Sequence, residues 1–322
     1  MTRRRATSQV SGNATRYGLA PFVVFLLVTL GSGVLWAAPR VDVVPANLST
    51  LIERAAKSPS RFAVDVPHVA SPSTAGEWTS SGDRRTWTYS AQIPGAVSMS
   101  FHATEAVLPA SATLAVTAAG TTYVYTSKDA HGGELWSRIG RSDSLTFELD
   151  VAAEDVDRVR LDIASLQAGY RGLGAGVPNH PRYDELRKQA LSTMTATASC
   201  AENWTCHVTA ENAGPGKATV GLIISNVGQC TGVLLNDVPG DGTPYVLTAR
   251  HCENGSADGG SPDAALNVTV YWNVISACGD PLGSFYDAGT VIQWGADTVV
   301  EQQDAWLIRL RQMPFFDAYY AE

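Results

Sequence analysis

The stretch Tyr245–Cys252 reads YVLTARHC, and the interpretation of the second half of the chain depends on it. An apolar run of this length predicts a β-strand, and the strand ends at a histidine followed directly by a cysteine. A disulfide at Cys252 would hold the segment that carries His251 in one orientation. A histidine beside a cysteine is by itself more often a structural residue than a catalyst, so the surrounding sequence has to decide its role.

Five further runs surround this stretch and predict short strands. The six predicted strands, including the one in this stretch, are Ala218–Ser225, Thr231–Leu235, Tyr245–Ala249, Leu266–Asn273, Gly289–Trp294 and Ala305–Leu310. Turn residues separate them, above all in Pro239–Gly242 and Gly255–Pro262. Six short antiparallel strands avoid exposed edges best by closing on themselves, so we expect a small β-barrel within residues 199–322.

Four blocks in this region occur in a characteristic order. They are Cys230–Leu235 (CTGVLL), Tyr245–Cys252 (YVLTARHC), Val270–Val274 (VYWNV) and Asp304–Leu310 (DAWLIRL). In this order they resemble the chymotrypsin/trypsin superfamily of serine endopeptidases, and more narrowly its bacterial lysyl endopeptidase-like branch. The resemblance covers residues 200–320, approximately, and implies the first six-stranded barrel of a trypsin-like fold. It also implies a catalytic pair, with His251 as general base and Asp304 as the carboxylate that orients it.

The alternative to Asp304 is Asp297, which lies earlier in the same region. The nucleophile is a separate matter, because the family order places its serine after the aspartate, on a second barrel. No GxSGG sequence occurs in the 322 residues, and Ser261 precedes Asp304 in an ordinary turn sequence. We therefore expect a precursor truncated before its serine, with the missing second barrel packing on residues 199–322 and with no activity of its own.

The five cysteines all lie from residue 200 onward, as expected for a region that folds in an oxidising compartment. The family resemblance implies the disulfides Cys206–Cys278 and Cys230–Cys252. It pairs the equivalent of Cys200 with the second barrel, so Cys200 is expected to be a free thiol here. No CxxC or HExxH spacing is present, so neither a metal nor another cofactor is expected.

Residues 39–177 show short alternating runs separated by turns, the pattern of a β-sandwich. Examples of the predicted strands are Thr86–Tyr89, Val97–His102, Ala112–Val116, Thr121–Tyr125, Leu145–Leu149 and Val159–Ile163, and one helix is predicted at Leu51–Lys57. The histidines of this region, His68, His102 and His131, are far apart in the sequence and suggest no chemistry. We interpret it as a propeptide-like, non-catalytic domain. Residues 178–198 form a polar linker suited to processing, with a short helix predicted at Tyr183–Leu191.

Residues 1–38 combine an arginine-rich start with an apolar stretch and the small residues Ala37 and Ala38. This composition is typical of a secretory signal peptide, although an uncleaved membrane anchor is compatible with it. Either one exports the rest of the chain, so we expect a secreted protein, with periplasmic or membrane-anchored locations as alternatives. The membrane would be contacted only through this segment.

The composition narrows the range of partners. The net charge is −8 and no basic patch follows residue 40, which argues against a nucleic-acid partner. Protein or peptide substrates are expected instead, and the cleavage specificity is left open because the pocket that sets it belongs to the second barrel. The competing hypothesis is a non-enzymatic secreted binding or scaffold protein with a degenerate half-protease domain.

Overall fold

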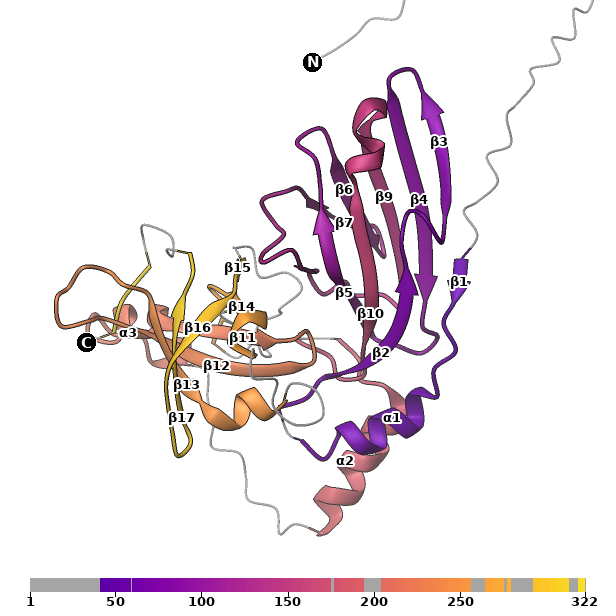
Figure 1. Cartoon of the computed structure of the whole chain (residues 1–322). Coiled ribbons are helices and arrows are strands. Elements are labelled where there is room, and N and C mark those ends of the chain that lie inside the picture. The colour runs from indigo at the N-terminus through magenta and orange to yellow at the C-terminus, as the bar shows by residue number, and fades with distance from the viewer. Residues whose placement is uncertain are drawn as a thin grey trace, which may run out of the picture. The chain divides into compact units, whose positions relative to one another are not determined.

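The computed structural model describes residues 41–58, 60–174, 177–193, 204–255, 264–274, 277–278, 292–312 and 318–321. The predictions for residues 1–38, Cys200 and Ser261 lie outside these residues. Within them, no helix is both long and apolar enough to cross a membrane. The structure is mainly β, which confirms the fold class expected from the sequence (Figure 1).

Residues 41–169 contain two β-sheets. The larger sheet has the order β1–β4–β9–β6–β7, with β3 also paired to β4. Its strands are β1 (Val41–Val43), β3 (Glu77–Ser81), β4 (Arg84–Gln92), β6 (Thr113–Ala118), β7 (Thr121–Tyr125) and β9 (Ser144–Ala152). The smaller sheet has the order β2–β10–β5–β8, with β2 (Ala63–Ala70), β5 (Ser98–Val107), β8 (Leu135–Trp136) and β10 (Arg160–Gly169).

The two sheets pack face to face around one hydrophobic core. Phe147 of β9 meets Phe101 of β5 edge to face, with ring centroids 5.0 Å apart, and Trp87 of β4 is fully buried beside them. Burying an aromatic or large aliphatic side chain is worth about 1.5–3 kcal/mol relative to leaving it exposed. The alternation that predicted the strands is therefore the alternation between this core and solvent.

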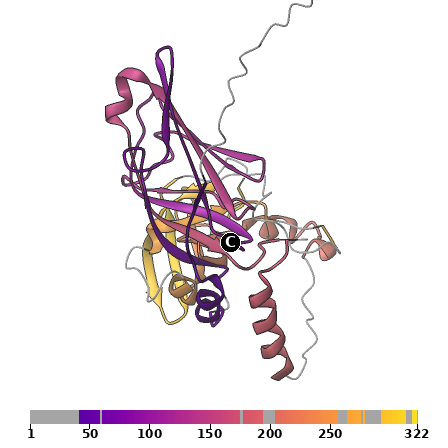
Figure 2. The ribbon, with the colours of Figure 1, turned by 90° about the vertical axis from the view of Figure 1, so that its right-hand side faces the viewer.

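Two helices accompany the sandwich. Helix α1 (Leu48–Ala55) begins at Asn47, whose side chain accepts a hydrogen bond from the backbone N–H of Thr50, and it buries Leu48, Ile52 and Ala55 on one face. Helix α2 (Pro181–Thr193) starts with a proline, a residue favoured at the first helical position. Arg182 of α2 is ion-paired with Glu53 of α1 at 2.6 Å, and the two helices lie side by side (Figures 1 and 2).

A third sheet, built from residues 219–310, has seven strands rather than the six expected. Its order is β15–β14–β11–β12–β13–β17–β16. The strands are β11 (Thr219–Ile224), β12 (Gly228–Leu235), β13 (Tyr245–Ala249), β14 (Val268–Tyr271), β15 (Ile292–Trp294), β16 (Ala296–Gln302) and β17 (Ala305–Leu310). Only Gly295 separates β15 from β16, so the two end strands of the sheet meet there, and we refer to this sheet as the half-barrel.

The half-barrel has a hydrophobic core of its own, which includes Leu222, Val246, Trp306 and Ile308. The strand that the sequence missed is β16, because only Ala296 at its start is buried and the rest is half-buried or exposed. Strand β3 was missed for the same reason, since all five of its residues are exposed. An exposed strand carries no alternation, so periodicity cannot reveal it.

Gly232 of β12 provides a test of how tightly the half-barrel is packed. A Cβ atom at this position would lie 2.6 Å from Val246 Cγ1 and 3.1 Å from Leu222 Cδ1. We expect Gly232→Ala to lower the free energy of unfolding by about 1–3 kcal/mol, because strands on both sides must shift. Urea unfolding would measure it. The neighbouring exposed Thr231→Ala should cost less than about 1 kcal/mol, and equal losses for the two variants would contradict the packing argument.

Candidate active site

The register of two neighbouring strands brings His251 and Asp304 together. Strands β13 and β17 pair antiparallel, and the last pair of the ladder is Ala249 with Ala305. His251 follows Ala249 by two residues, in the short 3-10 helix η3 (Arg250–Gly255). Asp304 directly precedes Ala305, in the turn between β16 and β17. One more backbone hydrogen bond, from Arg250 N–H to the Asp304 carbonyl at 2.9 Å, extends the pairing to the site.

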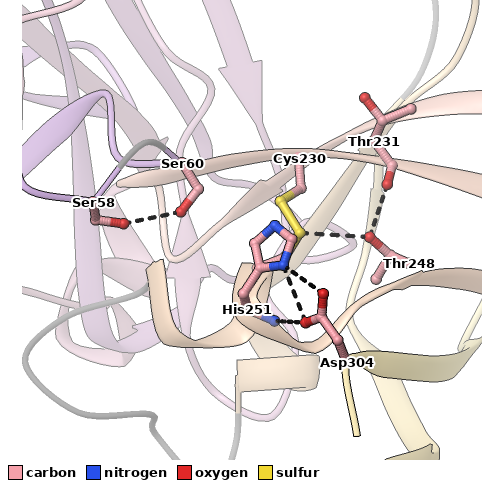
Figure 3. Close-up of a disulfide and its surroundings, with 8 residues drawn as sticks. Ser58, Ser60, Cys230, Thr231, Thr248, His251 and Asp304 are labelled. Atoms are coloured by element: carbon pink, nitrogen blue, oxygen red, sulfur yellow. Dashed lines mark hydrogen bonds and ion pairs between the residues drawn. A yellow bond between two sulfur atoms is a disulfide. The ribbon is translucent and has the colours of Figure 1, made fainter. Parts of the chain in front are cut away.

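Asp304 contacts both the backbone and the ring of His251 (Figure 3). The backbone N–H of His251 donates to Asp304 Oδ1 at 3.0 Å. The ring atom Nδ1 lies 3.1 Å from Oδ1 and 3.0 Å from Oδ2. A carboxylate only accepts, so this contact favours the tautomer with the proton on Nδ1 and leaves Nε2 with a lone pair.

The same two hydrogen bonds shift the titration of the carboxyl group. The His251 backbone N–H, and after it the imidazole ring, hold the pKa of Asp304 below its ordinary value of 3.8. Hydrogen bonds to the charged form of a carboxylate have this effect because they stabilise the anion. Asp304 is therefore an anion throughout the neutral range and is suited to stabilise an imidazolium beside it.

A disulfide holds the other side of the histidine. Cys252 is bonded to Cys230 of β12, with 6.0 Å between the two Cα atoms. The hydroxyl of Thr248 donates to the Thr231 carbonyl at 2.7 Å and lies 3.7 Å from Cys252 Sγ, so it joins β13 to β12 beside the disulfide. His251 therefore lies between a covalent link on one side and a carboxylate on the other.

The structure contains both disulfides that the family resemblance implied. Besides Cys230–Cys252 it has Cys206–Cys278, which joins residues 72 positions apart. The atoms of Cys230, His251 and Cys252 also lie within 4.8 Å of one another, close enough for a metal site. The two sulfur atoms are bonded to each other, however, so neither is available as a thiolate ligand.

The His251–Asp304 pair is open to solvent in the described part of the chain. The side chains of His251 and Asp304 are 61% and 67% exposed. Water screens an ion pair at this exposure, so its contribution to folding is small and its importance is geometric. More than half of each side chain is therefore in contact with solvent.

The alternative carboxylate, Asp297, lies elsewhere. It is in β16 and pairs with two arginines of the neighbouring β17 edge, Arg311 at 2.7 Å and Arg309 at 3.4 Å. The hydrogen bond from Arg311 is the main cause of its lowered pKa. Asp297 is therefore engaged in pairing across two strands, and it is Asp304 that meets the histidine.

The three histidines of the sandwich lie in other surroundings, and the buried Nε2 of His131 has no hydrogen-bond partner in the described structure. His68 Nε2 lies 2.6 Å from the Tyr89 hydroxyl, and His102 Nε2 lies 2.9 Å from Glu134. Burial is the main cause of the lowered pKa of His68 and of His131. None of these contacts resembles the arrangement at His251.

A second group of charged residues, Arg250 with Glu301 and Glu253, lies beside the histidine and was not predicted from the sequence. Arg250 Nε lies 3.7 Å from Glu301 of β16, and burial together with the nearby Glu301 raises the pKa of Glu253. Glu301 belongs to the exposed strand that periodicity did not reveal. Arg250, directly before His251, was the sequence feature that could have indicated an acidic partner nearby.

Comparison with known families finds a match in the second part of the chain. Residues 194–322 match the family described as "Lysyl endopeptidase, C-terminal domain". The match includes both disulfides and the whole His251–Asp304 site. This part of the chain is thus related to a protease family of the lysyl endopeptidase type.

The hydrogen bond to Asp304 predicts the tautomer of His251. At a pH where the ring is neutral, ¹⁵N NMR of the 322-residue chain should show the proton on Nδ1. Asp304→Asn should lose this bias, because an amide can donate as well as accept. Asp297→Asn, a matched change on β16, should leave the His251 spectrum as in the unmodified chain. If Asp304→Asn also left it unchanged, the Nδ1–carboxylate contact would be absent in solution.

The lowered pKa of Asp304 predicts a pH dependence of stability. A carboxyl group whose pKa is depressed by folding stabilises the folded state above its ordinary value of 3.8, and this contribution is lost as the pH falls through the folded-state pKa. The difference in unfolding free energy between the unmodified chain and Asp304→Asn should persist down to that ordinary value and shrink below it. Urea unfolding at a series of pH values measures it, and a difference that grew on acidification would contradict the assignment.

Proposed function

We propose that residues 199–322 supply the acid–base half of a serine-type endopeptidase, with His251 as general base and Asp304 as its orienting carboxylate. The observation that supports this most is the 3.0 Å contact between His251 Nδ1 and Asp304 Oδ2, on a histidine side chain that is 61% exposed. A proton acceptor fixed at one tautomer by a carboxylate is what nucleophilic attack by a serine requires. The match of residues 194–322 to a lysyl endopeptidase family supports the same chemistry.

In the proposed mechanism, His251 Nε2 takes the proton of a serine hydroxyl as the serine oxygen attacks the carbonyl carbon of a peptide bond. The Nδ1 proton stays on the ring, and Asp304 stabilises the imidazolium that forms. The same Nε2 proton then passes to the leaving amine, which completes acyl transfer to the serine. Water repeats the sequence to release the acyl group and restore the neutral histidine.

The serine would come from a second barrel that packs on the half-barrel, outside the 322 residues. An open groove of about 500 Å³ offers a surface for it, lined in part by Leu235, Leu247 and Val300. Gln303 and Ala305, the two neighbours of Asp304, also line this groove, so a domain seated there would adjoin the catalytic pair. Leu247 and Val300 are 40% and 47% exposed, as expected for apolar residues that await a partner.

The remaining features fit a secreted precursor acting on protein or peptide substrates. Two disulfides in residues 206–278 are consistent with an extracellular location. Residues 1–38 would direct export, residues 39–177 would be a propeptide-like domain, and a cut in residues 178–198 would separate it from the protease part.

A fluorophosphonate probe tests the absence of a nucleophile from the chain. Such probes attach to an activated serine, so the 322-residue protein should remain unlabelled while trypsin in the same reaction is labelled completely. A labelled serine in this chain would contradict the proposal that the nucleophile lies outside it.

A chimera tests the proposed roles directly. The 322-residue chain would be fused to the second barrel of a lysyl endopeptidase, and folding would be checked by disulfide mapping and a cooperative melting transition. We expect labelling of the added serine and hydrolysis of peptide esters. His251→Gln and Asp304→Asn should each lower kcat/KM, by about 10⁴-fold for the aspartate if it follows the known triad. Asp297→Asn is the matched control and should retain activity.

A folded chimera that is neither labelled nor active would overturn the proposal. It would instead favour the non-enzymatic alternative, in which the half-barrel is a scaffold. Equal activity of Asp304→Asn and Asp297→Asn would show that Asp304 does not orient the base.

A further inference from the structure

The turn between β11 and β12 joins two inner strands of the half-barrel and has a demanding backbone. Ser225 and Asn226 have consecutive positive φ angles, 49° and 54°, and Val227 N–H donates to the Ile224 carbonyl at 3.1 Å. This is the geometry of a two-residue hairpin turn with the twist that antiparallel strands favour. Asn226 is nonetheless only 2% exposed, which is unusual for the tip of a hairpin.

Residues 60–63, at the start of β2, pair with this hairpin. Arg61 and Gly228 form an antiparallel β-bridge. Gln229 N–H donates to the Ser60 carbonyl at 2.8 Å, and Phe62 N–H donates to the Val227 carbonyl at 2.9 Å. The segment thus adds a short extended piece to β12, in the manner in which peptides dock on sheet edges.

The side chain of Asn226 explains its burial. Its amide nitrogen donates to the backbone carbonyl of Ser137 at 2.9 Å, a residue that directly follows β8 of the sandwich. Both groups are buried, so separating them without water would leave a donor and an acceptor unsatisfied.

An apolar cluster surrounds these hydrogen bonds. This cluster is separate from the cores of the sandwich and of the half-barrel. The sandwich side contributes Phe62, Ala63, Ile139 and Leu173, and the half-barrel contributes Ile223, Val227 and Tyr271. Phe62 is 1% exposed and Ile223 is fully buried. The contact therefore has the apolar centre and the satisfied polar groups of a stable interface.

The docking segment is also fixed firmly to the sandwich. The Phe62 carbonyl accepts hydrogen bonds from the backbone N–H groups of Tyr170 and Arg171, at 2.8 and 3.1 Å. The hydroxyl of Tyr170 donates to the Arg61 carbonyl at 2.8 Å. Because the segment is held on this side, its other side is presented to the half-barrel already ordered, which lowers the entropic cost of docking.

We infer that the β11–β12 hairpin is a docking surface whose occupant is the sandwich of this same chain, and that the two stay bound to each other when residues 178–198 are cut. All of the contacts described above come from residues outside that linker. Cleavage of the linker would remove a tether and leave the interface in place. This goes beyond the proposed function, because it makes release of the sandwich a separate step from cleavage.

The docked segment lies next to the strand that carries the disulfide of the candidate site. Gln229, which binds Ser60, directly precedes Cys230, the cysteine bonded to Cys252 beside His251 (Figure 3). A retained sandwich therefore stays paired with the strand that carries the disulfide. Any exchange of one domain for another at this hairpin would have to displace it first.

A cut within the whole chain tests the inference without requiring peptidase activity. A recognition sequence for a site-specific protease would replace residues 193–199, and the purified protein would be cut to completion. All five cysteines lie after residue 199, so no disulfide can join the two fragments. We expect the fragments to co-elute in native size-exclusion chromatography and to separate in urea. A dilution series in the analytical ultracentrifuge gives the dissociation constant.

Two variants probe the interface, and one serves as control. Asn226→Gly keeps a residue that tolerates positive φ and deletes the bond to Ser137, so the dissociation constant should rise by about 10-fold or more. Phe62→Ala empties the apolar cluster and should raise it by about 100-fold or more. Asn273→Gly is the matched control, since Asn273 has a φ of 57° in the same half-barrel and is exposed, and it should leave the constant unchanged.

Fragments of the unmodified chain that separate on cutting would overturn the inference. Equal changes of the dissociation constant in Asn226→Gly and Asn273→Gly would also overturn it, because the Asn226 amide would then not contribute to binding. Circular dichroism of each uncut variant verifies folding, and Asn226→Gly keeps the test valid if Phe62→Ala does not fold. None of these results depends on whether His251 and Asp304 are catalytic.

Discussion

The antiparallel pairing of β13 with β17 is the constraint on which the candidate site depends. The ladder from Tyr245–Arg309 to Ala249–Ala305 fixes which residues emerge side by side at its end. His251 and Asp304 are 53 residues apart in the sequence, and no local preference could hold them 3.0 Å apart. A register slip of one residue would turn Trp306 and Ile308 away from the core, so the burial of these two side chains also protects the geometry of the site.

The site combines a rigid support with an open face. The Cys230–Cys252 disulfide, the Thr248 hydroxyl and the backbone bond of Arg250 restrain the segment around His251 on the inner side. On the outer side both members of the pair are more than half exposed. Such exposure is unusual for a carboxylate that orients a catalytic histidine, and under the proposed function a second barrel would cover the pair.

The sandwich and the half-barrel each have a separate core, yet they share a third cluster at the β11–β12 hairpin. This contact includes two kinds of hydrogen bond. One is made by the buried amide of Asn226, and the others pair the backbone of residues 60–63 with that of Val227–Gln229. Domains in one chain usually move relative to each other unless their interface is well packed and apolar. The contact therefore links the sandwich to the strand that carries the disulfide beside the histidine.

The sequence by itself determined the features that repeat along the chain or rest on a specific motif. Alternation predicted six of the seven strands of the half-barrel, from Ala218–Ser225 to Ala305–Leu310, because burial imposes alternation on a strand that has one face in a core. The four blocks carry the family resemblance, which predicted His251 and Asp304 as a pair and implied the two disulfides that the structure contains. Only the tertiary structure revealed the features that depend on exposed strands or on contacts between residues far apart in the sequence. Strand β16 and its Glu301 carry no alternation because they are largely exposed, and the docking of residues 60–63 on the hairpin rests on backbone groups that every residue possesses. Backbone hydrogen bonds leave no trace in side-chain chemistry, so only the folded chain could reveal them.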